Sequence, residues 1–238
     1  MKYTIYPEVF ELSSDIVVYL LVARGLKNRP GDEHDEHSLR HAEAAFQGKY
    51  GQSDIRSIPS VAAYRGLMEK AGINPNRYPP SIEAMLKRIA KGGRLPMINA
   101  IVDRLNAISL RTHLSMGAHD MRGIKHDLAL RLSTEGDRFL PLGSERWEEV
   151  APGELTWLSG SEVQTRRGLW RQSELAKTEL DSTDIYFHLV GFSGFEQAMD
   201  QAVSLMQELI DQLGGRADLY RIDREQPVAQ WADSMSEL

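Results

Sequence analysis

The sequence predicts an α/β (α+β) protein in which helices pack on a mixed β-sheet, within a single domain of 238 residues. Hydrophobic residues recur at helical spacing as far as Leu110 and alternate with polar residues from Leu128 onward, as in strands. A hydrophobic content of 42% suffices for one well-packed core, and no repeat, low-complexity tract or linker interrupts the chain. We therefore expect a strand and helix region over 1–55, a central core over 60–195, and a C-terminal helix and strand over 196–238.

One buried strand and several helices are expected in the first half of the chain. The apolar run from Ile16 to Val22 predicts the strand. Ser81 can cap a helix in which Ile82, Leu86 and Ile89 share one face, and the glycines at 92 and 93 end it. Further helices are expected over 32–47, 61–70 and 96–110, the last with Pro96 near its first turn.

Alternation predicts five strands in the second half, over 128–133, 154–159, 162–168, 184–191 and 217–222. Between the last two, Met199, Met206 and Leu209 lie on one side of a helix predicted over 194–213. We expect one mixed sheet to carry the strands at 128–133 and 184–191 in a continuous core, with this helix covering one face.

Composition limits the classes of function. A net charge of −6 argues against the broad basic face that DNA binding normally needs, although a local basic patch can still contact RNA. The absence of cysteine excludes disulfides, thiolate catalysis and cysteine-ligated zinc, and it agrees with a reducing, cytoplasmic location. The longest apolar run, over 16–23, is far shorter than the roughly 20 residues of a membrane span. We expect a soluble protein without a membrane partner.

The segment from Arg166 to Gln172 is the strongest chemical signal in the sequence. It also contains Arg167, Gly168, Trp170 and Arg171, so that three guanidinium groups, an indole and an amide are close in sequence. Guanidinium groups bind carboxylates and phosphates bidentately, and the glycine allows a backbone N–H to approach a ligand closely. A solvated surface strand is the alternative, since charge clusters on surfaces are often only hydrated.

A family resemblance favours the binding interpretation. The residues Asn74–Ile82, Gly92, Gly93, Pro96, Asn99, Asp103, Asn106 and Gly117–Asp120, followed by Leu130, Arg131, Gly136, Pro141 and Pro152–Glu154, occur in an order that resembles the B3/B4 domain of the phenylalanyl-tRNA synthetase beta subunit. The chain resembles the free-standing form of that domain. In the synthetase the domain is an editing module that hydrolyses tRNA carrying the wrong amino acid. The resemblance therefore implies a hydrolase of aminoacyl-tRNA that acts in trans, with tRNA and an amino acid as its partners.

The same resemblance suggests catalytic residues. Asp103 and Asn106 fall on the family's Val-Asp-x-x-Asn helix, and Asp120 on the aspartate that closes its His-Ala-Phe-Asp run. Where the family has the first histidine of that run, this chain has Gly117, and His119 stands two residues later. The family's pocket glutamate aligns near His188, so that the pocket has a different lining.

Chemistry gives these residues specific roles. Hydrolysis of an aminoacyl ester needs a placed water and a stabilised oxyanion, without a protein nucleophile. His119 or His188 can accept a proton from water, with Asp103 or Asp120 orienting the imidazole, and His119 is preferred because it is expected in a loop. Arg166, Arg167 or Arg171 can hold the terminal phosphates or the developing oxyanion, and Trp170 can stack on the terminal adenine.

Each of these roles has a structural alternative. Asp103 and Asn106 can simply brace backbone, Trp170 can belong to the core, and His188 can be a satisfied histidine of a buried strand. The changed pocket also leaves open a non-catalytic module that binds tRNA or an amino acid, or a hydrolase of a small carboxylate substrate.

One further cluster contains His34, His37 and His41, which share a face of the helix expected over 32–47. Imidazoles at this spacing can bind zinc. The acidic residues around them favour a solvated helix face instead. We therefore expect no metal site and no cofactor.

Overall fold

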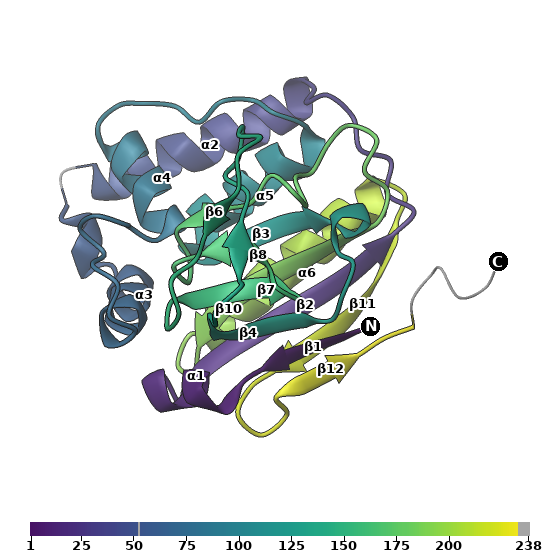
Figure 1. Cartoon of the computed structure of the whole chain (residues 1–238). Coiled ribbons are helices and arrows are strands. Elements are labelled where there is room, and N and C mark those ends of the chain that lie inside the picture. The colour runs from purple at the N-terminus through teal and green to yellow at the C-terminus, as the bar shows by residue number, and fades with distance from the viewer. Residues whose placement is uncertain (52, 233–238) are drawn as a thin grey trace.

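The computed structural model describes residues 1–51 and 53–232, which form two β-sheets and the helices that cover them (Figure 1). The larger sheet has the strand order β12-β1-β4-β7-β8-β5-β6, with β9 paired to β8, and the smaller has the order β11-β2-β10-β3. Their strands are β1 (Lys2–Ile5), β2 (Ile16–Arg24), β3 (Ser115–Asp120), β4 (Leu128–Leu132), β5 (Arg138–Phe139), β6 (Glu148–Glu149), β7 (Leu155–Ser159), β8 (Glu162–Arg166), β9 (Arg171–Gln172), β10 (Ile185–Phe192), β11 (Arg216–Ile222) and β12 (Val228–Gln230).

The α-helices are α1 (Pro7–Leu12), α2 (Glu33–Tyr50), α3 (Pro59–Lys70), α4 (Ser81–Ala90), α5 (Ala100–Thr112) and α6 (Glu196–Gln212). Short 3₁₀ turns occur at Ile55–Ser57 and Met121–Gly123. Among the described residues, no helix is both long and apolar enough to cross a bilayer.

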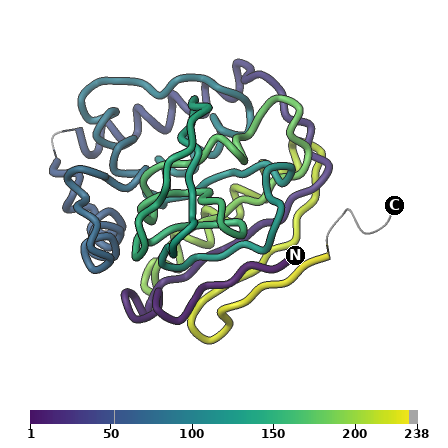
Figure 2. Tube along the Cα trace, viewed as in Figure 1, coloured from purple at the N-terminus to yellow at the C-terminus, as the bar shows by residue number. Residues whose placement is uncertain are grey.

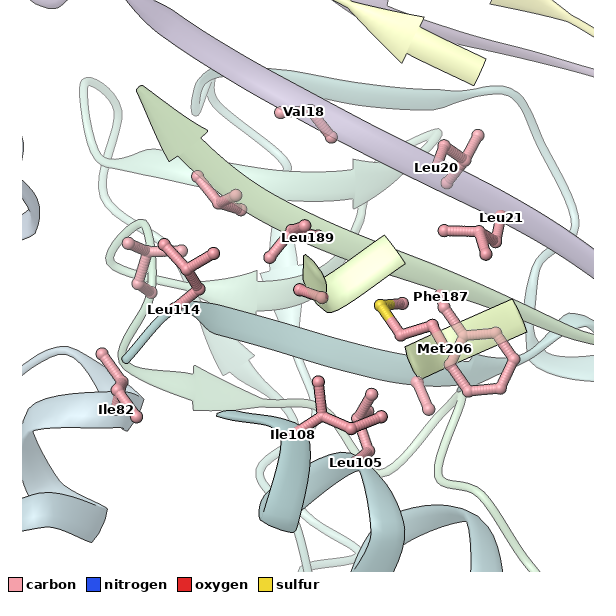
Figure 3. Close-up of a cluster of buried hydrophobic side chains, with 14 of the residues drawn as sticks. Val18, Leu20, Leu21, Ile82, Leu105, Ile108, Leu114, Phe187, Leu189 and Met206 are labelled. Atoms are coloured by element: carbon pink, nitrogen blue, oxygen red, sulfur yellow. The ribbon is translucent and has the colours of Figure 1, made fainter. Parts of the chain in front are cut away.

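Helices α5 and α6 cover one face of the smaller sheet, and α2 packs on α5. Figure 3 shows Met206 of α6 beside Phe187 of β10, with Leu105 and Ile108 of α5 in the same buried cluster. All eight residues of β10 are buried, which explains its nearly continuous apolar sequence. The other face of this sheet meets the larger sheet, where the ring of Trp157 stacks on that of His188. Residues of both sheets belong to one hydrophobic core.

The first and last strands of the fold lie side by side in the larger sheet, as the trace in Figure 2 shows. Strand β1 pairs antiparallel with β12, with Lys2 opposite Gln230, and parallel with β4, with Tyr3 opposite Leu128. Strands from the start and the end of the described chain therefore form one edge of the larger sheet.

The mixed α/β architecture is confirmed, with one correction to the expected sheet. Strands 128–133 and 184–191 belong to different sheets, as β4 and β10, although they share one core. Alternation along a strand shows which face is buried but not which strand lies beside it. Strand β10 pairs with β2 and β3, whereas β4 pairs with β1 and β7.

Two element boundaries also differ from expectation, for local reasons. Helix α5 begins at Ala100 and not near Pro96, because the side chain of Asn99 accepts a hydrogen bond from Val102 N at 3.0 Å and caps the helix there. Strand β8 ends at Arg166, because Arg167 and Gly168 adopt left-handed φ angles of 53° and 66° and turn the chain into β9.

Candidate functional site

A pocket of about 80 Å³ lies where β3 and β10 of the smaller sheet face β8 and β9 of the larger one, beside the first residue of α4. It is lined by Ser81, Ser115, Met116, Gly117, His119, Thr165, Leu169, Trp170, Arg171, Gln172 and His188. Six of these are among the residues expected from the sequence to form the site: Gly117, His119, Trp170, Arg171, Gln172 and His188.

Strand register places the histidines on one face of the smaller sheet. In the antiparallel pair of β3 and β10, Gly117 lies opposite His188 and His119 lies opposite Tyr186. Side chains two residues apart on a strand point to the same face. His119, which was expected in a loop, is therefore a strand residue, and the pairing with β10 brings it against His188.

Four aromatic rings form a continuous stack behind the pocket. The ring centroids are 4.6 Å apart for His119 and Tyr186, 4.9 Å for His119 and His188, and 4.9 Å for His188 and Trp157, with interplanar angles of 2°, 26° and 8°. Stacked rings of this kind fix one another's orientation. Both imidazoles are consequently held rigidly, with His119 only 1% exposed and His188 4% exposed.

The glycine at 117 makes room for this pair of imidazoles. A Cβ atom placed there would lie 3.1 Å from His119 Nε2 and 3.3 Å from His188 Nε2, closer than most real Cβ contacts. A side chain at 117, such as the histidine that the family resemblance suggests, would therefore require these rings to shift by a few tenths of an ångström.

Burial keeps both imidazoles neutral. It lowers the pKa of His119 well below the ordinary value of 6.5, with a further lowering from the neighbouring His188, and it lowers the pKa of His188 to about 4. Near neutral pH each ring therefore offers one N–H donor and one acceptor nitrogen.

Two hydroxyl groups line the pocket beside the start of α4. The Oγ atoms of Ser81 and Ser115 lie 3.0 Å apart, and Ser115 N donates to the hydroxyl of Tyr64 at 2.9 Å. Ser81 N donates to Leu169 O at 2.8 Å, which ties α4 to the turn between β8 and β9. The pocket therefore combines neutral imidazoles with hydroxyl donors.

The turn between β8 and β9 explains the arginine-rich segment. Gly168 is buried: its N–H donates to Leu155 O at 2.6 Å, and its carbonyl accepts from Trp157 Nε1 at 2.8 Å. It therefore shapes the turn and offers no free N–H to a ligand. Arg166 pairs with Glu148 at 2.6 Å and Glu154 at 2.9 Å, so that its charge is already compensated.

Three guanidinium groups and two aromatic rings lie together in what we call the arginine–aromatic surface: Arg77, Tyr78, Arg167, Trp170 and Arg171. Trp170 and Arg171 also line the pocket. The guanidinium of Arg167 lies 3.6 Å from the ring centroid of Tyr78 and 4.8 Å from that of Trp170. Arg77 lies over Tyr78 at 5.1 Å, and Arg171 over Trp170 at 5.9 Å. In the described part of the chain, no carboxylate pairs with Arg77 or Arg171, and both side chains are exposed.

Three residues assigned to catalysis by the resemblance do not line this pocket. Asp103 braces the start of α5, where its Oδ1 accepts from Ile98 N at 2.8 Å, and burial raises its pKa. Asn106 follows one helical turn later and is half-buried. Asp120 accepts from Arg122 N at 2.8 Å and from Ser182 Oγ.

The expectation that Asp103 or Asp120 orients His119 is therefore wrong. Burial acts to raise the pKa of Asp120, but its hydrogen bonds with Arg122 and Ser182 lower that pKa overall. Asp120 is thus an ionised partner of Arg122. Within residues 1–51 and 53–232, neither pocket imidazole hydrogen-bonds a carboxylate.

The histidine cluster of α2 is exposed at His34, His37 and His41, as a solvated helix face would be. Metal-ligating atoms of Asp32, His34 and Asp35 lie within 4.8 Å of one another. Asp35, however, already pairs with Arg29 at 2.6 Å and with Arg104 at 3.4 Å. The absence of a metal site at this helix stays a prediction.

A larger hollow, of about 780 Å³, lies elsewhere, lined by residues 135–138 and 147–152. Its charged groups are mostly carboxylates, and its Arg138 stacks on Trp147 with the guanidinium 4.1 Å from the ring centroid. Size alone does not identify a reactive site, and the smaller pocket has the convergent imidazoles and hydroxyls.

Five residues at the site were not predicted from the sequence: Ser81, which was expected only to cap a helix, and Ser115, Tyr186, Arg77 and Tyr78. Ser115 and Tyr186 become visible only once β3 is paired with β10 in the correct register. Arg77 and Tyr78 lie in the segment on which the family resemblance rests. An arginine next to an aromatic residue before a helix could have indicated that they contact a ligand.

Comparisons with known proteins found a family model and a solved structure that are similar to this chain. Residues 63–211, more than half of the chain, match the model of the B3/4 domain family. Among solved structures, an N-terminal fragment of the phenylalanyl-tRNA synthetase beta subunit from Pyrococcus horikoshii is similar over 90% of this chain, with 13% sequence identity and a TM-score of 0.44. The chain spans half the length of that fragment. No curated protein sequence matches the chain.

Proposed function

The chain belongs to the B3/4 domain family, and on that premise we propose that it is a trans-acting aminoacyl-tRNA deacylase that clears mischarged tRNA. One observation carries this proposal: a pocket with two neutral imidazoles lies beside the arginine–aromatic surface, of which Arg77 and Arg171 are exposed. The pocket suits an acyl group, and the surface suits the RNA end attached to it. The protein would act in the cytoplasm, where aminoacyl-tRNA is made and used.

The volume of the pocket favours a small aminoacyl group. A cavity needs roughly 10–15 Å³ to hold one water molecule, so that about 80 Å³ accommodates roughly five to eight water-sized atoms. An alanyl or seryl group has about that many non-hydrogen atoms, whereas an aromatic amino acid has more. We propose that the enzyme prefers small amino acids.

The reaction would be attack of water on the ester carbonyl, with release of the amino acid and of the ribose hydroxyl of tRNA. The aminoacyl ester is activated, so that a positioned water and a donor for the developing oxyanion suffice. His119 would hydrogen-bond at the reacting centre, and the hydroxyls of Ser81 and Ser115, 3.0 Å apart, would bind the polar atoms of the acyl group.

The arginine–aromatic surface would hold the unpaired 3′ end of tRNA. Single-stranded nucleic acids bind through bases stacked on aromatic rings and through phosphates paired with cations, and each stack is worth about 1–3 kcal/mol. Tyr78 and Trp170 supply the rings, with centroids 4.9 Å apart, and Arg77 and Arg171 supply charges without carboxylate partners in the described chain.

A titration with uncharged tRNA at several salt concentrations tests the RNA part of this proposal. Phosphate contacts make affinity fall steeply with salt, with a slope of about −0.7 per phosphate for a single strand. Arg77→Ala and Arg171→Ala should each reduce that slope, whereas Arg138→Ala, on the other hollow, is the matched control. An affinity that does not depend on salt would favour a small carboxylate substrate instead.

A non-catalytic tRNA-binding module is the second candidate. It is favoured by the lowered pKa of both imidazoles, which makes them weak bases, and by the lack of a carboxylate partner in the described chain. Tight, salt-dependent tRNA binding without release of any amino acid would establish this alternative.

A further inference from the structure

The side-chain amide of Gln172 is oriented by two backbone carbonyls. Its Nε2 lies 3.0 Å from Ala118 O and 3.3 Å from Ala176 O. Carbonyl oxygens only accept hydrogen bonds, so that the NH₂ group of the amide, and not its oxygen, must face them. The same nitrogen lies 3.4 Å from His119 Nδ1.

This orientation determines where His119 carries its proton. An amide NH₂ can only donate, and here its two hydrogens are shared among three neighbours, Ala118 O, Ala176 O and His119 Nδ1. A protonated Nδ1 would instead set N–H groups against each other. Nδ1 must therefore be the accepting nitrogen. We infer that Gln172 is a positioning residue that holds His119 in its Nε2–H tautomer, so that the imidazole presents an N–H donor to the pocket.

The donor nitrogen lies on the open side of the ring. His119 Nε2 faces Gly117, at 3.1 Å from where a Cβ would be, and that glycine lines the pocket. The buried ring is neutral, so that Nε2–H is a donor without a full positive charge. The site should therefore take ligands that place an oxygen acceptor, such as a carbonyl, at this nitrogen.

The consequence for catalysis rests on the proposed function. When water attacks the ester carbonyl, negative charge develops on its oxygen, and a fixed N–H donor stabilises that oxyanion. The electron pair returns to form the carbonyl of the acid as the C–O bond to ribose breaks, and the ribose oxygen takes the proton that the attacking water loses. His119 then acts as an oxyanion donor and not as the general base.

Nuclear magnetic resonance of the ¹⁵N-labelled imidazoles tests the tautomer directly, without tRNA. At pH 7 we expect His119 to show a pyrrole-like Nε2 and a pyridine-like Nδ1, assigned by the loss of these signals in His119→Gln. The exposed His37 is the internal reference. A protonated Nδ1, or a doubly protonated ring, in the wild-type protein would overturn the inference.

Variants of Gln172 test whether this residue sets the tautomer. Gln172→Met removes the donor, and both His119 nitrogens should then move to averaged shifts as the two tautomers exchange. Gln172→Glu can only accept, so that the two carbonyls repel its carboxylate and it cannot donate to Nδ1; the preference for the Nε2–H tautomer should be lost here too. The carbonyls of Ala118 and Ala176 keep other donors, Thr178 Oγ1 at 3.1 Å and Asp120 N at 3.0 Å, so that neither is left unpaired.

A wild-type tautomer that persists in both variants would show that Gln172 does not set it. The ¹⁵N signals of His119 must be measured in folded protein, and unchanged His37 signals between the variants serve as the check. If the Nε2–H tautomer is found and depends on Gln172 while no tRNA is hydrolysed, the proposed function fails and the tautomer assignment stands. The two ideas therefore fail separately.

Discussion

Acidification should destabilise the fold through the buried histidines. His188 has an ordinary pKa of 6.5 in the unfolded chain and a pKa of about 4 in the folded protein, because burial disfavours its charged form. Below pH 6.5 His188 therefore binds a proton in the unfolded chain but stays unprotonated in the folded chain until the pH approaches 4. Stability is fully present above pH 6.5 and is lost as the pH falls toward 4.

The size of this effect follows from the shift of the pKa. The pKa of His188 differs by about 2.5 units between the two states, and each unit corresponds to 1.36 kcal/mol, so that the free energy of unfolding can fall by at most about 3 kcal/mol. At pH 5 the fall should already be about 2 kcal/mol. His119, whose pKa burial also lowers, adds a loss of the same sign. Most carboxylates stay ionised above pH 5, so that the histidines should account for most of the pH dependence of stability between pH 5 and pH 7.5.

Urea unfolding at pH 7.5 and pH 5.0 measures this loss in the wild type and in His188→Phe. The variant keeps an aromatic ring to stack on Trp157 but has no proton to bind. Its free energy of unfolding should fall by about 2 kcal/mol less than that of the wild type. His37→Phe, at an exposed position, is the matched control and should retain the wild-type dependence. Equal pH dependence in wild type and His188→Phe would refute the assignment of a buried, neutral His188.

Three further predictions concern other parts of the molecule. Arg171→Ala should weaken tRNA binding and reduce the slope of log affinity against log salt by about 0.7, measured by titration; an unchanged slope would remove this residue from the RNA surface. Asp103→Ala should lower the free energy of unfolding by about 1–3 kcal/mol, because Ile98 N loses its acceptor, and should leave the deacylation rate unchanged; a lost activity in folded protein would restore its catalytic role. The purified protein should contain no stoichiometric zinc by elemental analysis, and one tightly bound metal per chain that is lost in His37→Ala would contradict this.

Local sequence patterns predicted most of the fold. The alternation at 128–133 and 184–191 and the helical stripe of Met199 and Met206 identified β4, β10 and α6 closely. The short strand β1 was missed, because four residues give too little periodicity to recognise. The assignment of β4 and β10 to one sheet failed, because partner choice depends on contacts distant in sequence.

The candidate site was predicted in part, for the same physical reason. His119, His188 and Arg171 were selected by residue type, and strand pairing does bring them to one pocket. The predicted partner of His119 was wrong, because Asp120 follows it in sequence but accepts a hydrogen bond from Arg122 instead. Gln172 was expected to bind substrate, and only its hydrogen bonds to two carbonyls indicate that it orients the imidazole.

A deacylation assay over a panel of mischarged tRNAs tests the central claim most directly. The wild-type protein should release a small amino acid such as alanine or serine from a mischarged tRNA faster than from the correctly charged one, and faster than it releases an aromatic amino acid. His119→Ala should slow this release by at least about 10²-fold while tRNA binding is kept, and His41→Ala, at an exposed position, should leave it unchanged. Release that is equally fast with His119→Ala, or no release from any tRNA in the panel, would contradict the account.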